Sequence, residues 1–249
     1  MEYVLYVLIA LYGLCFGSFT NVLIYRIPRG MEWIRTPSHC LTCNHRLRWY
    51  ENIPLLSYLL QRGRCRSCGV RISPQYPIIE ALVGAFWLLT ALLYRSDPIT
   101  LVLYCLLLPP LLALSVIDWR TLEIPDGFPL FIALLGALRL ATDFRHWSVY
   151  LLGAVSVSGF FLLLYLATRG RGIGFGDVKL MAAAGLLIGF PNILLAMFLG
   201  FVSGSIVHLF RMRWGGAGRM LAFGPYLAFG IWCAALFGPR IIRWYLSLF

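Results

Sequence analysis

Long runs of apolar residues without charge are the feature that most constrains how this chain can fold. A run of roughly 20 such residues can cross the hydrocarbon core of a bilayer as a helix. Because lipid offers no hydrogen bonds to the backbone, several such runs predict a bundle of transmembrane helices. The composition agrees: 60% of the 249 residues are hydrophobic and only 12% are charged. We therefore exclude a soluble globular enzyme and expect an all-α polytopic membrane protein.

About eight transmembrane helices are expected. Their segments are residues 3–24, 78–94, 99–117, 128–138, 149–168, 180–190, 193–210 and 221–237. The fourth and sixth hold only about half of the residues that a crossing helix needs, so they must borrow polar flanks, be buried or line a wet cavity. No cleavable signal peptide is expected, because the start of the chain lacks a basic region and its first apolar run is too long.

The basic residues predict the orientation of these helices. Sixteen of the 21 Lys and Arg follow the first, third, fifth and seventh spans, and thus share one side of the membrane. Since basic residues collect on the cytoplasmic side, both termini are expected outside and residues 26–77 in the cytoplasm. Attraction to anionic membrane lipids explains the formal charge of +11, so we expect no nucleic-acid partner.

Residues 26–77 are the one sizeable polar insertion, lying between a first helix (1–25) and a helical bundle (78–249). The insertion contains two C-x2-C pairs, separated by 21 residues: Cys40, Cys43, Cys65 and Cys68. Two such knuckles complete the tetrahedral four-sulfur shell that zinc takes in structural sites. Because this shell leaves no position for water or substrate, the metal is expected to clamp the insertion rather than do chemistry.

Other interpretations of this cysteine module stay open. A pair of disulfides is disfavoured by a reducing cytoplasm, and a redox C-x-x-C would not need two copies with this spacing. His39 and His45 could substitute as ligands, although a solvated or supporting role is favoured.

Two of the ten acidic residues stand at the ends of apolar segments. Asp118 directly follows the third span, and Asp177 ends the sequence GFGD at 174–177, just before the sixth. The topology brings both to the same face of the membrane, where an ionisable group is a functional candidate. Each also has a structural alternative: Asp177 could cap the following helix, and Asp118 could pair with Arg120 or Lys179.

Two carboxylates within hydrogen-bonding distance share one proton over a wide pH range. One then acts as a base that activates water and the other as an acid, which is the chemistry of peptide hydrolysis by an aspartic dyad. We expect Gly174 and Gly176 to take positive φ angles and to let the backbone approach an extended substrate.

With these motifs the chain resembles the bacterial type IV prepilin leader peptidase family of polytopic aspartic peptidases. The segments that carry the resemblance are GSFTN at 17–21, the two cysteine pairs, ENIP at 51–54, YPIIE at 76–80, ID at 117–118, IPD at 124–126, GFGDVKL at 174–180 and FGPYL at 223–227. The resemblance implies that Asp118 and Asp177 are catalytic, that Gly174, Gly176 and Lys179 form a supporting loop, and that the four cysteines bind zinc.

The resemblance also implies a substrate and a second activity. Family members cut the basic leader of prepilins and type II secretion pseudopilins after a glycine, at the cytoplasmic face of the bacterial inner membrane. Those with the cysteine module also N-methylate the new terminus from S-adenosylmethionine. Because the net charge has the same sign as the leader, local acids would have to receive it; these are Glu51, Glu80, Glu123 and Asp126. For Glu80 and Asp126, a helix-end cap or a pair with an arginine is an equal alternative.

Three other functions remain as alternatives at this point. The first is a leader peptidase without methyl transfer, in which the module only stabilises or guides the substrate. The others are an ion-coupled transporter whose aspartates relay cations, and a non-catalytic membrane scaffold. Transporters usually have duplicated halves, and the GFGD segment and the cysteine module each occur once.

Overall fold

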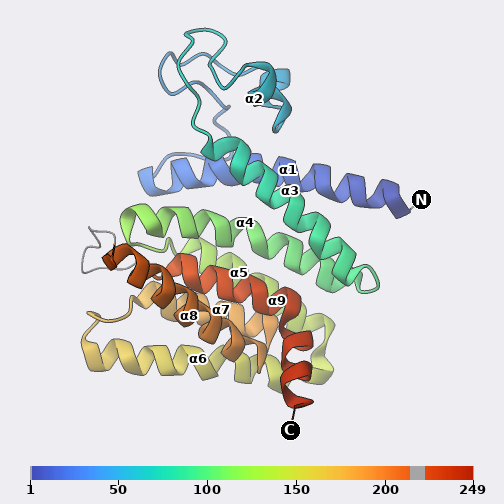
Figure 1. The fold of residues 1–249 in the computed structure, drawn as a ribbon, viewed down its shortest axis with the longest axis vertical. Helices are drawn as coiled ribbons and strands as arrows, with labels where there is room; N and C mark the ends of the chain where they lie inside the picture. Colours follow the sequence, from blue (N-terminus) through green and yellow to red (C-terminus); the bar gives the residue numbers. More distant parts are fainter. Residues whose placement is uncertain (1, 214–221, 249) are drawn as a thin grey trace. The chain divides into compact units, whose positions relative to one another are not determined.

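A computed structural model describes residues 2–213 and 222–248 (Figure 1). Apart from two isolated bridges, the regular structure in these residues is helical. The helices are α1 (Glu2–Arg26), η1 (Ile27–Arg29), η2 (Trp49–Asn52), α2 (Leu56–Leu60), α3 (Gln75–Tyr94), α4 (Pro98–Thr121), α5 (Gly127–Thr142), η3 (Phe144–His146), α6 (Trp147–Thr168), α7 (Phe175–Ile188), α8 (Asn192–Arg213) and α9 (Gly224–Leu246). The expected all-α fold is confirmed.

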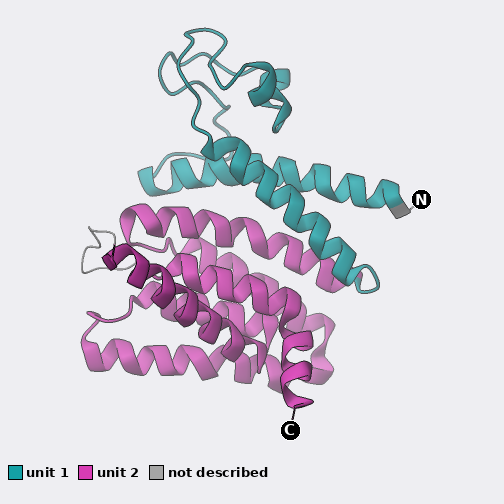
Figure 2. Ribbon diagram, in the orientation of Figure 1, with its two compact units in different colours: residues 1–97 teal, residues 98–249 magenta. Residues whose placement is uncertain are grey.

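The chain forms two compact units, residues 1–97 and 98–249 (Figure 2). In the first unit, α1 and α3 pack against each other, and the polar insertion joins them. Their backbones approach closely, because a Cβ atom at Gly13 would lie 2.9 Å from the Cα atom of Gly84. Such small residues allow helices to pack tightly in membranes.

The second unit is a bundle of the six remaining α-helices. Within it, α7 packs between α5 and α6, while α9 packs against both α4 and α8. Further contacts join α4 to α5 and α7 to α9. The bundle therefore brings together the end of α4 and the starts of α7 and α9, where the predicted catalytic residues lie.

Six helices in the described part of the chain are long and apolar enough to cross a membrane: α1, α3, α4, α6, α8 and α9. The fourth and sixth expected spans correspond to the shorter helices α5, with 16 residues, and α7, with 14. Most residues of α7 are buried, which is one of the ways in which a short span was expected to be accommodated. Residue 221, where the eighth span is expected to begin, lies outside the described residues.

The close packing of α8 against α9 predicts that a larger residue at their contact lowers the stability of the protein. A Cβ atom at Gly230 would lie 2.9 Å from the backbone nitrogen of Gly200 and would overlap the Ala196 carbonyl oxygen. Because these are backbone atoms, Gly230→Ala is expected to destabilise the protein by about 3 kcal/mol, as an overpacked core does. Thermal unfolding in detergent, followed by size-exclusion chromatography, measures the change.

Gly159→Ala is the matched control for this substitution. Gly159 also lies in a helix of the second unit, but a Cβ atom there would meet no other atom within 4 Å. Alanine also has the higher helix propensity, so this variant is expected to unfold at or above the native temperature. Equal unfolding temperatures for the two variants would show that α8 and α9 do not pack as described.

Candidate active site and metal centre

Asp118 lies in the last turn of α4, and its side chain is buried. The backbone N–H of Gly224, the first residue of α9, donates a hydrogen bond of 2.8 Å to Oδ2 of Asp118. A Cβ atom at position 224 would lie 2.8 Å from the same oxygen, so glycine is needed for this approach. Asp118 forms no ion pair among the described residues, and the alternative pairing with Arg120 or Lys179 is not formed.

Asp177 lies in the first turn of α7, outside the six long apolar helices, and it is also buried. The N-cap of α7 is Gly174, whose N–H donates a 3.2 Å hydrogen bond to Oδ2 of Asp177. Asp177 therefore supports the helix start from its third position, and it is not the N-cap. Burial, together with the nearby charge of Asp118, raises the pKa of Asp177 to about 7.

The supporting loop differs in one respect from the expectation. The prediction of positive φ angles at Gly174 and Gly176 is wrong, because Gly174 has a φ of −74° and Gly176 lies inside α7. Packing restricts position 176 instead, since a Cβ atom there would lie 3.0 Å from the Cβ of Ile124. Lys179 donates a 2.8 Å hydrogen bond to Oδ1 of Asp126, which ties α7 to the residue that precedes α5.

The four acids expected to receive a basic leader are divided between the two units. Glu123 and Asp126 follow α4 in the second unit and are exposed, although Asp126 is paired with Lys179 rather than with an arginine. Glu51 and Glu80 belong to the first unit and are buried. Glu80 accepts a 2.8 Å hydrogen bond from the N–H of Leu55, the residue before α2.

The four cysteines of the module form one compact sulfur cluster. All four Sγ atoms lie within 4.8 Å of one another. The Sγ atoms of Cys40 and Cys68 are 3.9 Å apart, and those of Cys43 and Cys65 are 4.0 Å apart. Four sulfurs at about 2.3 Å from a zinc ion, in a tetrahedron, would be about 3.8 Å apart, whereas a disulfide needs about 2.05 Å. The cluster therefore fits a metal ion, and all four thiols are free.

The two knuckles have the same backbone geometry. The N–H of Asn44 donates to the carbonyl of Cys40, and that of Gly69 donates to the carbonyl of Cys65, both at 2.9 Å. Asn44 and Gly69 both have left-handed φ angles, of 55° and 72°, which these residue types tolerate best. The equivalence explains how two short segments far apart in the chain present matching pairs of thiolates.

His39 and His45 lie beside the first knuckle, but neither belongs to the sulfur cluster. His45 contacts the carboxylate of Glu51 at 3.2 Å, and Nδ1 of His39 lies 3.2 Å from the Pro37 carbonyl. The four sulfurs therefore form the cluster without either imidazole.

The sequence motifs indicate no role for Gly224, although the segment FGPYL at 223–227 contains it. Nothing in the spacing reveals that this N–H reaches Asp118, because the two residues are 106 positions apart. Fold and site together define a polytopic membrane protein with a buried pair of interacting aspartates and a four-cysteine metal-binding insertion.

Known families contain both parts of this arrangement. Residues 11–94 match the Bacterial Peptidase A24 N-terminal domain, and residues 101–209 match the Type IV leader peptidase family. The chain belongs to the type IV leader peptidase family, and the expected resemblance is confirmed. As a member of a peptidase family it is an enzyme.

Curated relatives match over most of the chain. A protein of Aeromonas hydrophila is 35% identical, over 97% of this chain and 94% of its own length. One of Pseudomonas putida is 34% identical, over 92% and 89%, and one of Pseudomonas aeruginosa is 33% identical, over 95% and 92%. All three are named prepilin leader peptidase/N-methyltransferase. No solved structure matches the chain.

Proposed function

We propose that this protein removes the basic leader of type IV prepilins and pseudopilins after a glycine, and that it methylates the new N-terminus. Asp118 and Asp177 are the catalytic pair. The observation that carries this proposal is the burial of the two carboxylates close enough for the charge of one to act on the other. The names of the curated relatives support the choice of substrate.

In this mechanism the aspartates share one proton. The ionised carboxylate takes a proton from a water molecule, whose oxygen attacks the carbonyl carbon of the scissile peptide bond. The protonated carboxyl donates its proton to the departing amine as the carbon–nitrogen bond breaks. The Gly224 N–H holds Asp118 and the Gly174 N–H holds Asp177, so both acids are oriented before substrate arrives.

The substrate carries its own apolar helix, so it can enter sideways from the bilayer with its leader junction at the depth of the aspartates. Because enzyme and substrate are both held in the membrane, the scissile bond needs only to be positioned at the aspartates and does not have to reach them by diffusion through solution. Glu123 and Asp126 are exposed in the unit that holds the aspartates, and they receive the basic leader there. Basic residues flanking the helices support a cytoplasmic site in a bacterial inner membrane, in contact with anionic lipids.

We further propose that zinc occupies the sulfur cluster and that S-adenosylmethionine supplies the methyl group. Residues 26–77 form the zinc module, residues 1–25 the first membrane helix, and residues 78–249 the peptidase bundle. Four thiolates fit zinc and leave it no open position, so the ion orders the insertion. The names of the relatives support methyl transfer.

Reconstitution with a prepilin in liposomes tests this function. Purified protein is expected to shorten the prepilin by its leader, and added S-adenosylmethionine is expected to increase the mass of the product by one methyl group. Intact-mass spectrometry reads both steps. Cleavage without methylation would show that the protein is a leader peptidase that does not transfer methyl groups. No cleavage at all would contradict the proposed function and favour the transporter or scaffold alternatives.

The shared proton predicts how cleavage depends on pH. Because the pKa of Asp177 is about 7, raising the pH through this value removes the proton that the dyad needs as its acid. The kcat/KM for prepilin cleavage is therefore expected to fall about tenfold for each pH unit well above 7. A rate that stays constant up to about pH 9, while size-exclusion chromatography shows the protein folded, would contradict a shared proton on this pair.

A further inference from the structure

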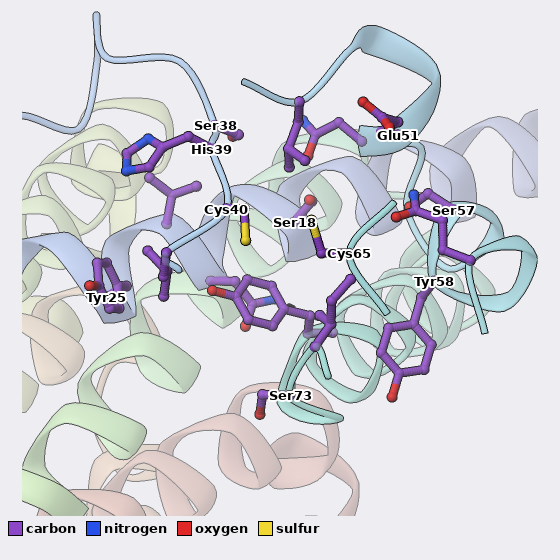
Figure 3. Close-up of a pocket in the computed structure, with 18 of the residues that line it drawn as sticks. Ser18, Tyr25, Ser38, His39, Cys40, Glu51, Ser57, Tyr58, Cys65 and Ser73 are labelled. Carbon is purple, nitrogen blue, oxygen red and sulfur yellow. Dashed lines mark hydrogen bonds between the residues drawn. The ribbon is translucent and has the colours of Figure 1, made fainter. Parts of the chain in front are cut away.

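A cavity of about 350 Å³ lies within the first unit, between α1, the cysteine module and the start of α3. Its volume falls in the range of roughly 300–1,000 Å³ that small-molecule sites occupy. Figure 3 shows Ser18 and Tyr25 of α1 around this space, with Cys40, Cys65 and Glu51 of the insertion. All the residues that line the cavity belong to the first unit, whereas Asp118 and Asp177 belong to the second.

Two buried acids line the cavity. Glu51 and Glu80 are each only 6% exposed, although acidic side chains are rarely buried without a partner. The hydrogen bonds to Glu51, from the Arg48 N–H and from His45, all fall on Oε2, so Oε1 is available to a ligand. The Arg48 N–H lowers the pKa of Glu51, which therefore stays ionised at neutral pH.

A buried cation, Arg26, lines the same cavity and is 5% exposed. Its guanidinium donates to the main-chain carbonyls of Glu32, Thr36 and Pro37, at 3.2, 2.7 and 3.2 Å. These neutral groups do not balance its charge, and Arg26 forms no ion pair among the residues described. A guanidinium has five N–H donors, so two remain for an anion.

We propose that this cavity is the binding site for S-adenosylmethionine. The inference rests on the proposed methyl transfer and assigns that activity to named residues. The ligand carries two positive groups, the sulfonium and the amine, and one carboxylate. Glu51 and Glu80 complement the two cations, and Arg26 complements the carboxylate.

The remaining walls suit the uncharged part of the ligand. Tyr25, Tyr58 and Tyr76 offer aromatic surface to the adenine ring, and the side chain of Ser57 offers a hydroxyl to the ribose hydroxyls. Two other basic side chains also line the cavity; Arg71 is exposed, and His39 is partly exposed. The other candidate for this cavity is a basic side chain of the prepilin leader. A lysine or arginine would pair with a glutamate but would give Arg26 no anion, so the lining favours a ligand that carries both charges.

Binding can be measured apart from catalysis, by equilibrium dialysis of the full-length protein in detergent with radiolabelled S-adenosylmethionine. Glu51→Gln and Glu80→Gln are each expected to weaken binding at least tenfold, because they remove a charge but keep an oxygen for the Arg48 or Leu55 N–H. Asp97→Asn is the matched control: the same charge is lost in the same unit, but Asp97 follows α3 at the end away from the cavity and does not line it. Its affinity is expected to stay within twofold of the native value.

Ligand analogues test the site in the native protein, where folding is not in question. Decarboxylated S-adenosylmethionine lacks the anion for Arg26, and S-adenosylhomocysteine lacks the sulfonium charge, so both are expected to compete at least tenfold more weakly. Native affinity in both glutamine variants, or equal competition by all three ligands, would overturn the site. A native protein that cuts prepilin but binds no S-adenosylmethionine would instead overturn the proposed methyl transfer.

Discussion

Asp118→Asn and Asp177→Asn are each expected to reduce prepilin cleavage by at least about a thousandfold, as removal of a catalytic group does in other peptidases. Asparagine keeps the shape of aspartate but can neither take a proton from water nor give one to the leaving amine. Its side-chain oxygen can still accept the N–H of Gly224 or Gly174, so the local fold is expected to remain. The measurement is the rate of leader removal from a prepilin in liposomes, at equal amounts of folded enzyme.

Asp143→Asn is the control for the loss of a negative charge from the second unit. Asp143 is hydrogen-bonded to His146 and Tyr150 at the other end of α5, far in the sequence from either catalytic aspartate. This variant is expected to cut at a rate close to that of the native protein. If either catalytic variant did the same, the dyad would be wrong, and a different group would have to activate the water.

Cys43→Ser is expected to have the second largest effect, on the metal and on the order of the insertion. A structural zinc site contributes about 10–16 kcal/mol to folding in zinc-finger peptides, and a hydroxyl replaces a thiolate poorly. The variant is therefore expected to purify with little zinc, to be cut by added protease within residues 26–77, and to lose methyl transfer. Metal analysis by mass spectrometry and limited proteolysis measure the first two changes.

Cys15→Ser provides the comparison for this experiment. Cys15 lies in α1, in the same unit, and does not belong to the sulfur cluster. It is expected to leave the zinc content at one ion per chain and the insertion resistant to protease. Full zinc occupancy in Cys43→Ser would show that this thiolate is not a ligand.

Much of the fold can be predicted from the sequence. A long apolar segment that crosses a membrane forms a helix, because a helix pairs the backbone N–H and C=O groups of the segment with one another. The apolar runs therefore predict the positions of eight helices, of which six are long and apolar enough to cross a membrane; the short runs at 128–138 and 180–190 correspond to α5 and α7. Their packing partners could not be predicted. A uniformly apolar helix has no polar face to show which side meets a neighbour, and in lipid small residues such as Gly153 and Gly185 decide the contact.

Local spacing predicts the chemistry of the site better than its geometry. The C-x2-C pairs define the sulfur cluster, because the ligand spacing is itself the local structure. The φ angles of Gly174 and Gly176 were predicted wrongly, since a glycine can also be needed for close packing in an ordinary helix, as it is at Gly176. The cavity lined by Glu51, Glu80 and Arg26 depends on how α1, α3 and the insertion meet, which no short motif encodes.

The hydrogen bond from Gly224 to Asp118 has a consequence for biosynthesis. A ribosome makes α4 and α7 well before α9, so Asp118 lacks its N–H partner until the last membrane helix has been synthesised and has docked. In the proposed mechanism, Asp118 is therefore not fully oriented while the chain is still being inserted. We therefore expect full peptidase activity only from a chain that has completed and docked its final helix.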